Sequence, residues 1–202
     1  MNKKVIIISI IAVILIAGGV VAFLFFTKQS SNFDPTGPPV AVVPLAADLS
    51  RDLKACTTVS KADVQSALGA TAGSLQGPDN MGLISTKSGE QSQVCVFAFV
   101  TGGTINDSFN IGNAFSIEVF EHKDQASVDK DKTAKSVATV SGIGDAAYFF
   151  NTSTETTVRH ELKVYSGLKH YTFTLAQPAD QSAFSDSTAR AALEAIATSA
   201  TY

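Results

Sequence analysis

A long uncharged segment near the N-terminus constrains this chain more than any other feature. Residues Val5–Phe26 are almost all apolar and carry no charge, and lysines lie just outside the segment at Lys3, Lys4 and Lys28. A helix of about 20 apolar residues spans the roughly 30 Å hydrocarbon core of a bilayer. The segment therefore predicts one transmembrane helix, and we assign residues 1–27 to an N-terminal membrane anchor.

A cleaved secretory signal peptide is the alternative. Its apolar region is about 7–15 residues long and ends at a site of small residues. Here the apolar run is longer, it ends on the bulky pair Phe25-Phe26, and no cysteine follows closely to carry a lipid. We therefore favour an uncleaved, single-pass anchor. By the positive-inside rule, Lys3 and Lys4 predict a cytoplasmic N-terminus and an extracytoplasmic C-terminal domain in the cell membrane.

Beyond Lys28 the chain is acidic. It has 12 Lys and Arg there against 18 Asp and Glu, a net charge of −6. Nucleic-acid binding needs a basic surface, so we expect no nucleic-acid partner. The whole chain has no tryptophan, which weakens a carbohydrate-binding interpretation. About 150 residues are enough for one hydrophobic core, so a single domain is expected.

Residues 28–50 are predicted to form a spacer. The segment holds four of the six prolines in the chain, namely Pro35, Pro38, Pro39 and Pro44. Proline-rich linkers adopt extended, semi-rigid conformations. Val40–Val43 could instead dock as an edge strand. Residues 51–202 then form the extracytoplasmic domain.

Cys56 and Cys95 are the only cysteines, and both lie in the predicted extracytoplasmic domain. An even number of cysteines in an oxidising compartment favours a disulfide. Two free, buried thiols are the alternative. The disulfide would attach the first helix of the domain to the middle of its sheet.

Hydrophobic periodicity gives the expected elements. It predicts strands over 93–100, 115–120, 147–151, 156–165 and 168–177, and helices over 60–68, 124–138 and from Ser185 onward. Ser60 is expected to cap the first helix and Gly69 to end it. Residues 69–82 are predicted to be a loop. This order predicts an α+β fold, an antiparallel sheet packed with helices as an α/β sandwich, preceded by one transmembrane helix.

The strands over 156–165 and 168–177 predict a hairpin with a turn at Ser166-Gly167, which would pair Leu162 with Tyr171. One face of this hairpin is apolar. The other is expected to carry Arg159, Glu161, Lys163, His170, Thr172 and Thr174.

No catalytic, metal or cofactor site is predicted. The three histidines, His122, His160 and His170, show no H-x-x-H or Cys/His pattern, and the hairpin alternation puts His160 and His170 on opposite faces. We expect two exposed histidines and one at the edge of the core. Asp129 and Asp131 are interpreted as part of a solvated, charged helix face.

The connection over 102–113 is the candidate binding segment. It carries Ile105, Phe109 and Ile111 within a Gly/Asn-rich sequence. Loops of this length are commonly functional or disordered. The three apolar side chains either fold back onto the sheet or contact a partner or an apolar ligand.

Three sequence stretches resemble a known kind of domain. They are Cys56 with Val59–Val64 and Ala67–Gly69, Cys95-Val96-Phe97, and Val140–Tyr148. Together they are similar to small extracytoplasmic domains of unknown function on actinobacterial-type cell-envelope lipoproteins, some of which resemble the PsbP-like α/β/α sandwich. The resemblance covers about residues 55–200. This chain differs in having an apolar helix where those proteins have a lipidated cysteine. It also has Phe97 at a position where the usual aromatic residue is often tryptophan. The resemblance implies a fold and a cell-envelope location but no catalytic residues.

The sequence therefore predicts a membrane-anchored extracytoplasmic binding or interaction module without catalysis. Its partner would be a cell-envelope protein. The alternative is a sensor or accessory domain that holds a small apolar or envelope-derived ligand in a cleft, and an enzyme is the third candidate.

Overall fold

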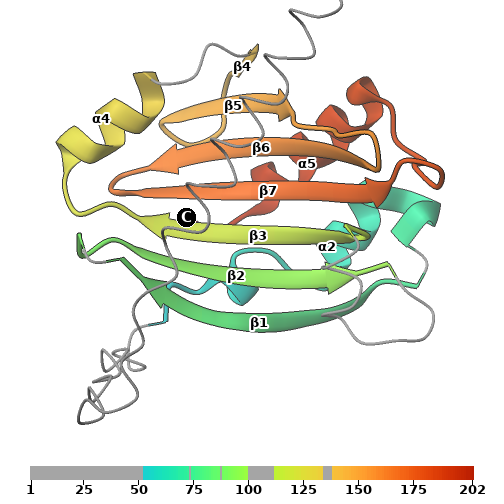
Figure 1. The fold of residues 1–202 in the computed structure, drawn as a ribbon, viewed down its shortest axis with the longest axis horizontal. Coiled ribbons are helices and arrows are strands. Elements are labelled where there is room, and N and C mark those ends of the chain that lie inside the picture. Colours follow the sequence, from blue (N-terminus) through green and yellow to red (C-terminus); the bar gives the residue numbers. More distant parts are fainter. Residues whose placement is uncertain (1–51, 73, 87, 100–111, 134–137) are drawn as a thin grey trace, which may run out of the picture. The chain divides into compact units, whose positions relative to one another are not determined.

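The computed structural model describes residues 52–72, 74–86, 88–99, 112–133 and 138–202 (Figure 1). All of them belong to one compact unit, Pro44–Tyr202. The predicted anchor, the predicted spacer, and Ile105, Phe109 and Ile111 lie outside the described residues. Among the described residues, no helix has the length and apolar character needed to cross a membrane.

The domain is built on a seven-stranded sheet in which all neighbouring strands are antiparallel, in the order β1-β2-β3-β7-β6-β5-β4. The strands are β1 (Gln76–Ser85), β2 (Gln91–Ala98), β3 (Ala114–Glu121), β4 (Ala138–Val140), β5 (Ala146–Asn151), β6 (Thr157–Ser166) and β7 (Lys169–Pro178). The helices are α2 (Lys61–Leu68), α4 (Gln125–Thr133) and α5 (Asp186–Ser199), with short 3₁₀ helices η1 (Ala55–Thr57) and η2 (Gly69–Ala72). The predicted α+β class and the sandwich of sheet and helices are confirmed for the described residues.

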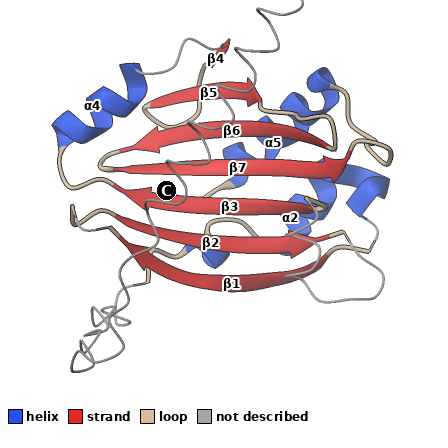
Figure 2. Cartoon of the chain, in the orientation of Figure 1, coloured by secondary structure: helices blue, strands red, loops and turns tan. Residues whose placement is uncertain are grey.

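α2 and α5 lie behind the sheet, and α4 lies beside one end of its strands (Figure 2). α2 and α5 cover one face, where the main hydrophobic core includes fully buried Phe97, Phe115 and Phe173. α4 lies at one end of the opposite face, because its Asp131 contacts Lys163 and Tyr165 of β6, whose side chains point away from that core. The rest of the opposite face, over β2, β3, β7 and β6, is left without a helix among the described elements (Figure 1).

Local sequence signals fix the ends of two helices. The Ser60 side chain accepts a hydrogen bond from the Asp63 backbone N–H, and Asp63 accepts one from the Ser60 backbone, which forms a capping box. Gly69 follows the last residue of α2 with a positive φ of 59°. Ser185 caps α5 in the same way, together with Thr188. Both predicted helix starts are confirmed.

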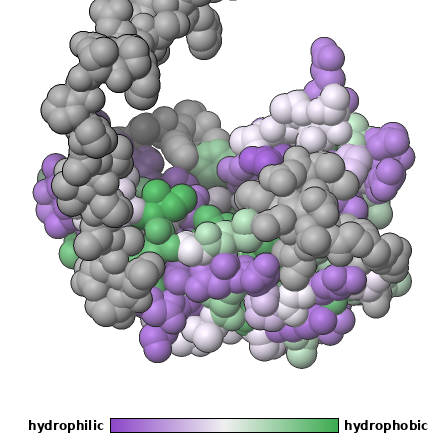
Figure 3. Space-filling model, turned by 60° about the horizontal axis from the view of Figure 1, so that its bottom comes forward, coloured by the Kyte–Doolittle hydropathy of each residue, from purple (hydrophilic) through white to green (hydrophobic). Residues whose placement is uncertain are grey.

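The two edge strands were not predicted. β1 occupies the second half of the predicted loop 69–82, and β4 begins at Ala138, where the predicted helix 124–138 should still continue. None of the residues in either strand is buried, so neither shows the apolar alternation of a half-buried strand. Gly77 in β1 has a φ of 104°, and a Cβ there would lie 2.6 Å from the carbonyl oxygen of Val96 in β2. A glycine, which in a sequence usually indicates a loop, is therefore needed here for β1 to approach β2. Figure 3, with the β1 edge brought forward, shows hydrophobic and hydrophilic residues interspersed on this side.

The hairpin of β6 and β7 forms, but its register differs from the prediction. Leu162 faces Phe173 and Tyr165 faces His170, which moves the turn to Gly167-Leu168. Gly167 has a positive φ of 57° at the first central position of the turn, where a two-residue hairpin commonly takes glycine. Because the shift is two residues and side chains alternate with a period of two, the predicted polar and apolar faces are unchanged.

A disulfide joins Cys56 and Cys95, as the sequence predicted, with 39 residues of sequence separation. It connects η1, just before α2, to β2. β2 is the second strand from the edge, so the predicted attachment to the middle of the sheet is wrong.

Candidate functional site

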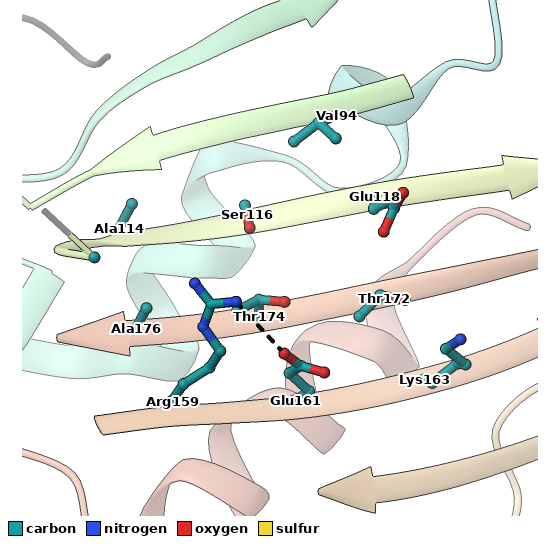
Figure 4. A pocket seen from close by; sticks show the side chains of 11 residues that line it. Val94, Ala114, Ser116, Glu118, Arg159, Glu161, Lys163, Thr172, Thr174 and Ala176 are labelled. Carbon is teal, nitrogen blue, oxygen red and sulfur yellow. Dashed lines mark ion pairs between the residues drawn. The ribbon is translucent and has the colours of Figure 1, made fainter. Parts of the chain in front are cut away.

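A hollow of about 250 Å³ lies on the sheet face opposite α2 and α5 (Figure 4). We call it the polar hollow. Its polar side chains come from three adjacent strands: Ser116 and Glu118 from β3, Thr172 and Thr174 from β7, and Arg159, Glu161 and Lys163 from β6. Ala114 and Ala176 lie toward one end, where their small side chains leave space.

The charged groups of the polar hollow are held by neighbours. Arg159 Nη1 lies 3.9 Å from Glu161 Oε1, as the dashed line in Figure 4 shows. Glu161 also accepts a hydrogen bond from Thr152 Oγ1, and Glu118 accepts one of 2.6 Å from Ser92 Oγ. The hollow thus presents positive and negative groups with hydroxyls between them, all on strands rather than on loops.

Lys163 connects the polar hollow to a second cluster. Its side chain is 10% exposed, and its Nζ lies 3.3 Å from Asp131 Oδ2 on α4. The Tyr165 hydroxyl donates a 2.8 Å hydrogen bond to the same oxygen. Burial alone would raise the pKa of Asp131, but the hydrogen bond from Tyr165 and the charge of Lys163 hold that pKa below its ordinary value. Asp131 is therefore a carboxylate near neutral pH.

The second cluster, which we call the histidine cluster, comprises His122, His170 and Asp131. His122 Nε2 and His170 Nδ1 lie 2.9 Å apart. Both histidines are almost fully buried, and the Phe120 ring stacks on His170 with 4.9 Å between ring centroids. Asp131 Oδ2 lies 3.3 Å from His170 Nδ1 and 3.8 Å from His122 Nε2.

Strand pairing brings the two histidines together. β3 and β7 are antiparallel neighbours in which Phe120 faces His170, and the backbone N–H of His122 donates to the Leu168 carbonyl at 2.9 Å. Burial lowers the pKa of His122, although the charges of Asp131 and Glu90 oppose this effect. An open recess of about 510 Å³ adjoins the cluster, and Glu90 and Ser127 contribute to its wall.

The structure corrects two expectations about these residues. All three histidines are buried, so the prediction that two are exposed is wrong. Asp131 is not part of a solvated face, because Lys163 and Tyr165 bind it, whereas Asp129 is exposed as predicted. The prediction that His160 and His170 lie on opposite faces is confirmed by the register of β6 and β7.

The polar hollow was partly visible in the sequence. Its β6 and β7 residues are on the predicted polar face of the hairpin, and Ser116 and Glu118 alternate with apolar residues in β3. The missing information was that β3 pairs with β7, which the order of elements along the chain does not give. The same pairing places His122 beside His170, two residues that are 48 positions apart.

Comparison of the chain with protein-family models, with curated proteins and with solved structures finds no match. The resemblance to cell-envelope lipoprotein domains stays a prediction. Function is therefore inferred from the two sites and from the sequence.

Proposed function

We propose that this chain is a membrane-anchored extracytoplasmic binding module without catalysis, and that the polar hollow is its ligand site. The observation that supports this most strongly is the hollow itself: a concave sheet face that presents both signs of charge and three hydroxyls from three rigid strands. Binding groups fixed on strands lose little conformational freedom when a ligand binds, which favours affinity.

The lining of the hollow favours a small zwitterionic ligand, such as an amino acid or a dipeptide. Arg159 and Lys163 can bind a carboxylate, and Glu118 and Glu161 can bind an ammonium group. A purely apolar ligand would remove these charges from water without replacing their hydrogen bonds, which is costly. We therefore prefer a polar ligand to the apolar one considered from the sequence.

The contacts of the polar groups support recognition rather than chemistry. Serine and threonine act as nucleophiles only when an adjacent base activates them. The described residues that line the hollow offer hydroxyls at Ser116, Thr172 and Thr174 but include no histidine. Glu118 and Glu161, the carboxylates present, already accept hydrogen bonds from Ser92 and Thr152.

The proposed location rests on the apolar segment Val5–Phe26 and on the disulfide. Disulfides persist in oxidising compartments, which agrees with a domain outside the cytoplasm. Two measurements test the location. The chain should stay in the membrane fraction after an alkaline wash, and protease added to intact cells should remove the domain. Release by the wash, or protection from the protease, would contradict it.

Ligand binding can be tested on the full chain in non-ionic detergent by saturation-transfer NMR. The probes are a set of zwitterionic dipeptides, and a medium-chain fatty acid of similar volume is the apolar comparison. We expect dipeptides to bind and the fatty acid not to bind. Thr174→Tyr should fill the hollow and abolish binding, whereas the near-isosteric Thr174→Val should retain it. Fatty-acid binding, or dipeptide binding that survives Thr174→Tyr, would refute the proposed site.

A sensor role is the second candidate. It is favoured by Lys163, which lines the polar hollow and at the same time contacts Asp131 of the histidine cluster. A ligand carboxylate that draws the ammonium group toward the hollow would weaken its contact with Asp131. A sensor should then show changed imidazole NMR signals of His122 and His170 when a dipeptide binds, and a simple binding module should not.

A further inference from the structure

The three facing atoms of the histidine cluster are spaced like the ligands of a metal ion. His122 Nε2, His170 Nδ1 and Asp131 Oδ2 are separated by 2.9, 3.3 and 3.8 Å. Bonds of about 2.0–2.1 Å in a tetrahedral zinc site place neighbouring ligand atoms about 3.3 Å apart. The three separations lie around this value. We propose that His122, His170 and Asp131 bind a divalent transition-metal ion, for which Zn²⁺ is the probe.

The donor set suits such an ion. Imidazole nitrogens bind Zn²⁺, Cu²⁺ and Ni²⁺, and a carboxylate completes a common set of three protein ligands. The three residues come from the end of β3, from β7 and from α4, so the folded domain holds the ligands together. The adjoining recess leaves room for water or a ligand atom in a fourth position.

The surroundings of His122 provide a second, independent observation. Its side chain is only 5% exposed, and its Nδ1 has no hydrogen-bond partner among the described residues, although Glu90 Oε1 is 3.9 Å away. Histidines that bind metals commonly donate the other ring N–H to a carboxylate, which orients the ring. A metal on Nε2 would leave the proton of His122 on Nδ1, the ring nitrogen that lies 3.9 Å from Glu90 Oε1.

The positive charge of Lys163 should oppose metal binding, so its removal tests the proposed site. Its ammonium group lies 3.3 Å from Asp131 Oδ2, where it neutralises the carboxylate when no ion is bound. A dication at the cluster would be repelled by this charge. Lys163→Gln should therefore tighten Zn²⁺ binding, by on the order of tenfold. Few substitutions that merely disturb a fold would improve metal binding.

The experiment measures Zn²⁺ affinity of the full, untagged chain in non-ionic detergent by competition with a fluorescent chelator. We expect one ion per chain. His122→Gln, His170→Gln and Asp131→Asn should each weaken binding by roughly tenfold or more. His160→Gln is the matched control, because His160 is also buried but lies on the opposite face of the sheet, and it should bind as the wild type does.

Co²⁺ provides a measurement that needs no variant. In the wild-type chain it should produce the visible absorption of a tetrahedral site with nitrogen and oxygen ligands, and Zn²⁺ should remove that absorption. Circular dichroism of each variant separates loss of the site from loss of the fold. The proposal is overturned if the wild type and Lys163→Gln both bind Zn²⁺ more weakly than about 100 μM, or if His170→Gln folds and binds as well as His160→Gln.

Discussion

Reduction of the disulfide between Cys56 and Cys95 should cost this domain a large part of its stability. The bond closes a loop with a sequence separation of 39 residues. In the chain-entropy model, opening a loop of this length destabilises the folded state by about 4 kcal/mol, because the unfolded chain gains freedom. Domains of this size are stable by about 5–15 kcal/mol in total.

The reduced domain should still fold, because other contacts hold the segment around η1, one of them to the sheet and one to the C-terminal residues beyond α5. The backbone N–H of Ala55 donates to Gln93 Oε1 on β2 at 3.1 Å, and that of Thr201 donates to the Thr58 carbonyl at 2.9 Å. A loss of about 4 kcal/mol then appears as a lower midpoint rather than as unfolding at room temperature. At about 3 °C per kcal/mol, the melting temperature should fall by about 12 °C.

Thermal circular dichroism of the full chain in detergent, with and without reductant, measures this change. The Cys56→Ala/Cys95→Ala double variant is the control, and its midpoint should not respond to reductant. That midpoint should lie at or below that of the reduced wild type, because Cys95 is fully buried and alanine leaves a small cavity. A wild-type midpoint that moves by less than about 2 °C, with both thiols shown to be free, would refute the reasoning.

Three further predictions concern a cap, acid pH and the predicted loop. Ser60→Ala removes the capping hydroxyl of α2 and should cost about 1 kcal/mol in urea unfolding, and an unchanged midpoint would contradict the capping role. Burial lowers the pKa of His160 from 6.5, with Asp186 acting in the opposite direction, and burial also lowers the pKa of His122. The unfolded chain therefore binds more protons than the folded chain below about pH 6.5, so the free energy of unfolding should fall from pH 7 to pH 5. His160→Phe should make this pH dependence less steep. An unchanged pH dependence would contradict a contribution from His160. If Phe109 and Ile111 form a contact surface, replacing both with Ser should change stability by about 0.5 kcal/mol or less per site, whereas a loss of about 2–5 kcal/mol per site in a thermal melt would place them in the core.

The central elements of the fold could be predicted because local and tertiary signals agree there. β2, β3 and β7 are buried against the core and show apolar runs or alternation, and Ser60 and Ser185 mark helix starts by their capping chemistry. The edge strands β1 and β4 could not be predicted in this way. They pair on one side only and none of their residues is buried, so burial leaves no periodic pattern in their sequences.

The candidate sites depend on pairings between distant parts of the chain. The polar alternation of β6 and β7 indicated half of the polar hollow, but the other half required the knowledge that β3 lies beside β7. Asp131 looked like one of several charges on a surface helix, and only its contact with Tyr165 and Lys163 shows that it points toward the histidines. A helix that lies across the end of a sheet is not visible in the periodicity of either element.

The most direct test of the proposed function is to locate the ligand on the protein. The measurement is a ¹⁵N–¹H correlation spectrum of the full chain in detergent, recorded during titration with the tightest dipeptide from the NMR set. The largest shift changes should occur at the backbone amides of Ser116, Thr172 and Thr174, and mass spectrometry should recover the dipeptide unchanged. Changes centred on the β1 edge or elsewhere, or a dipeptide converted to products, would contradict a non-catalytic binding module with its site in the polar hollow.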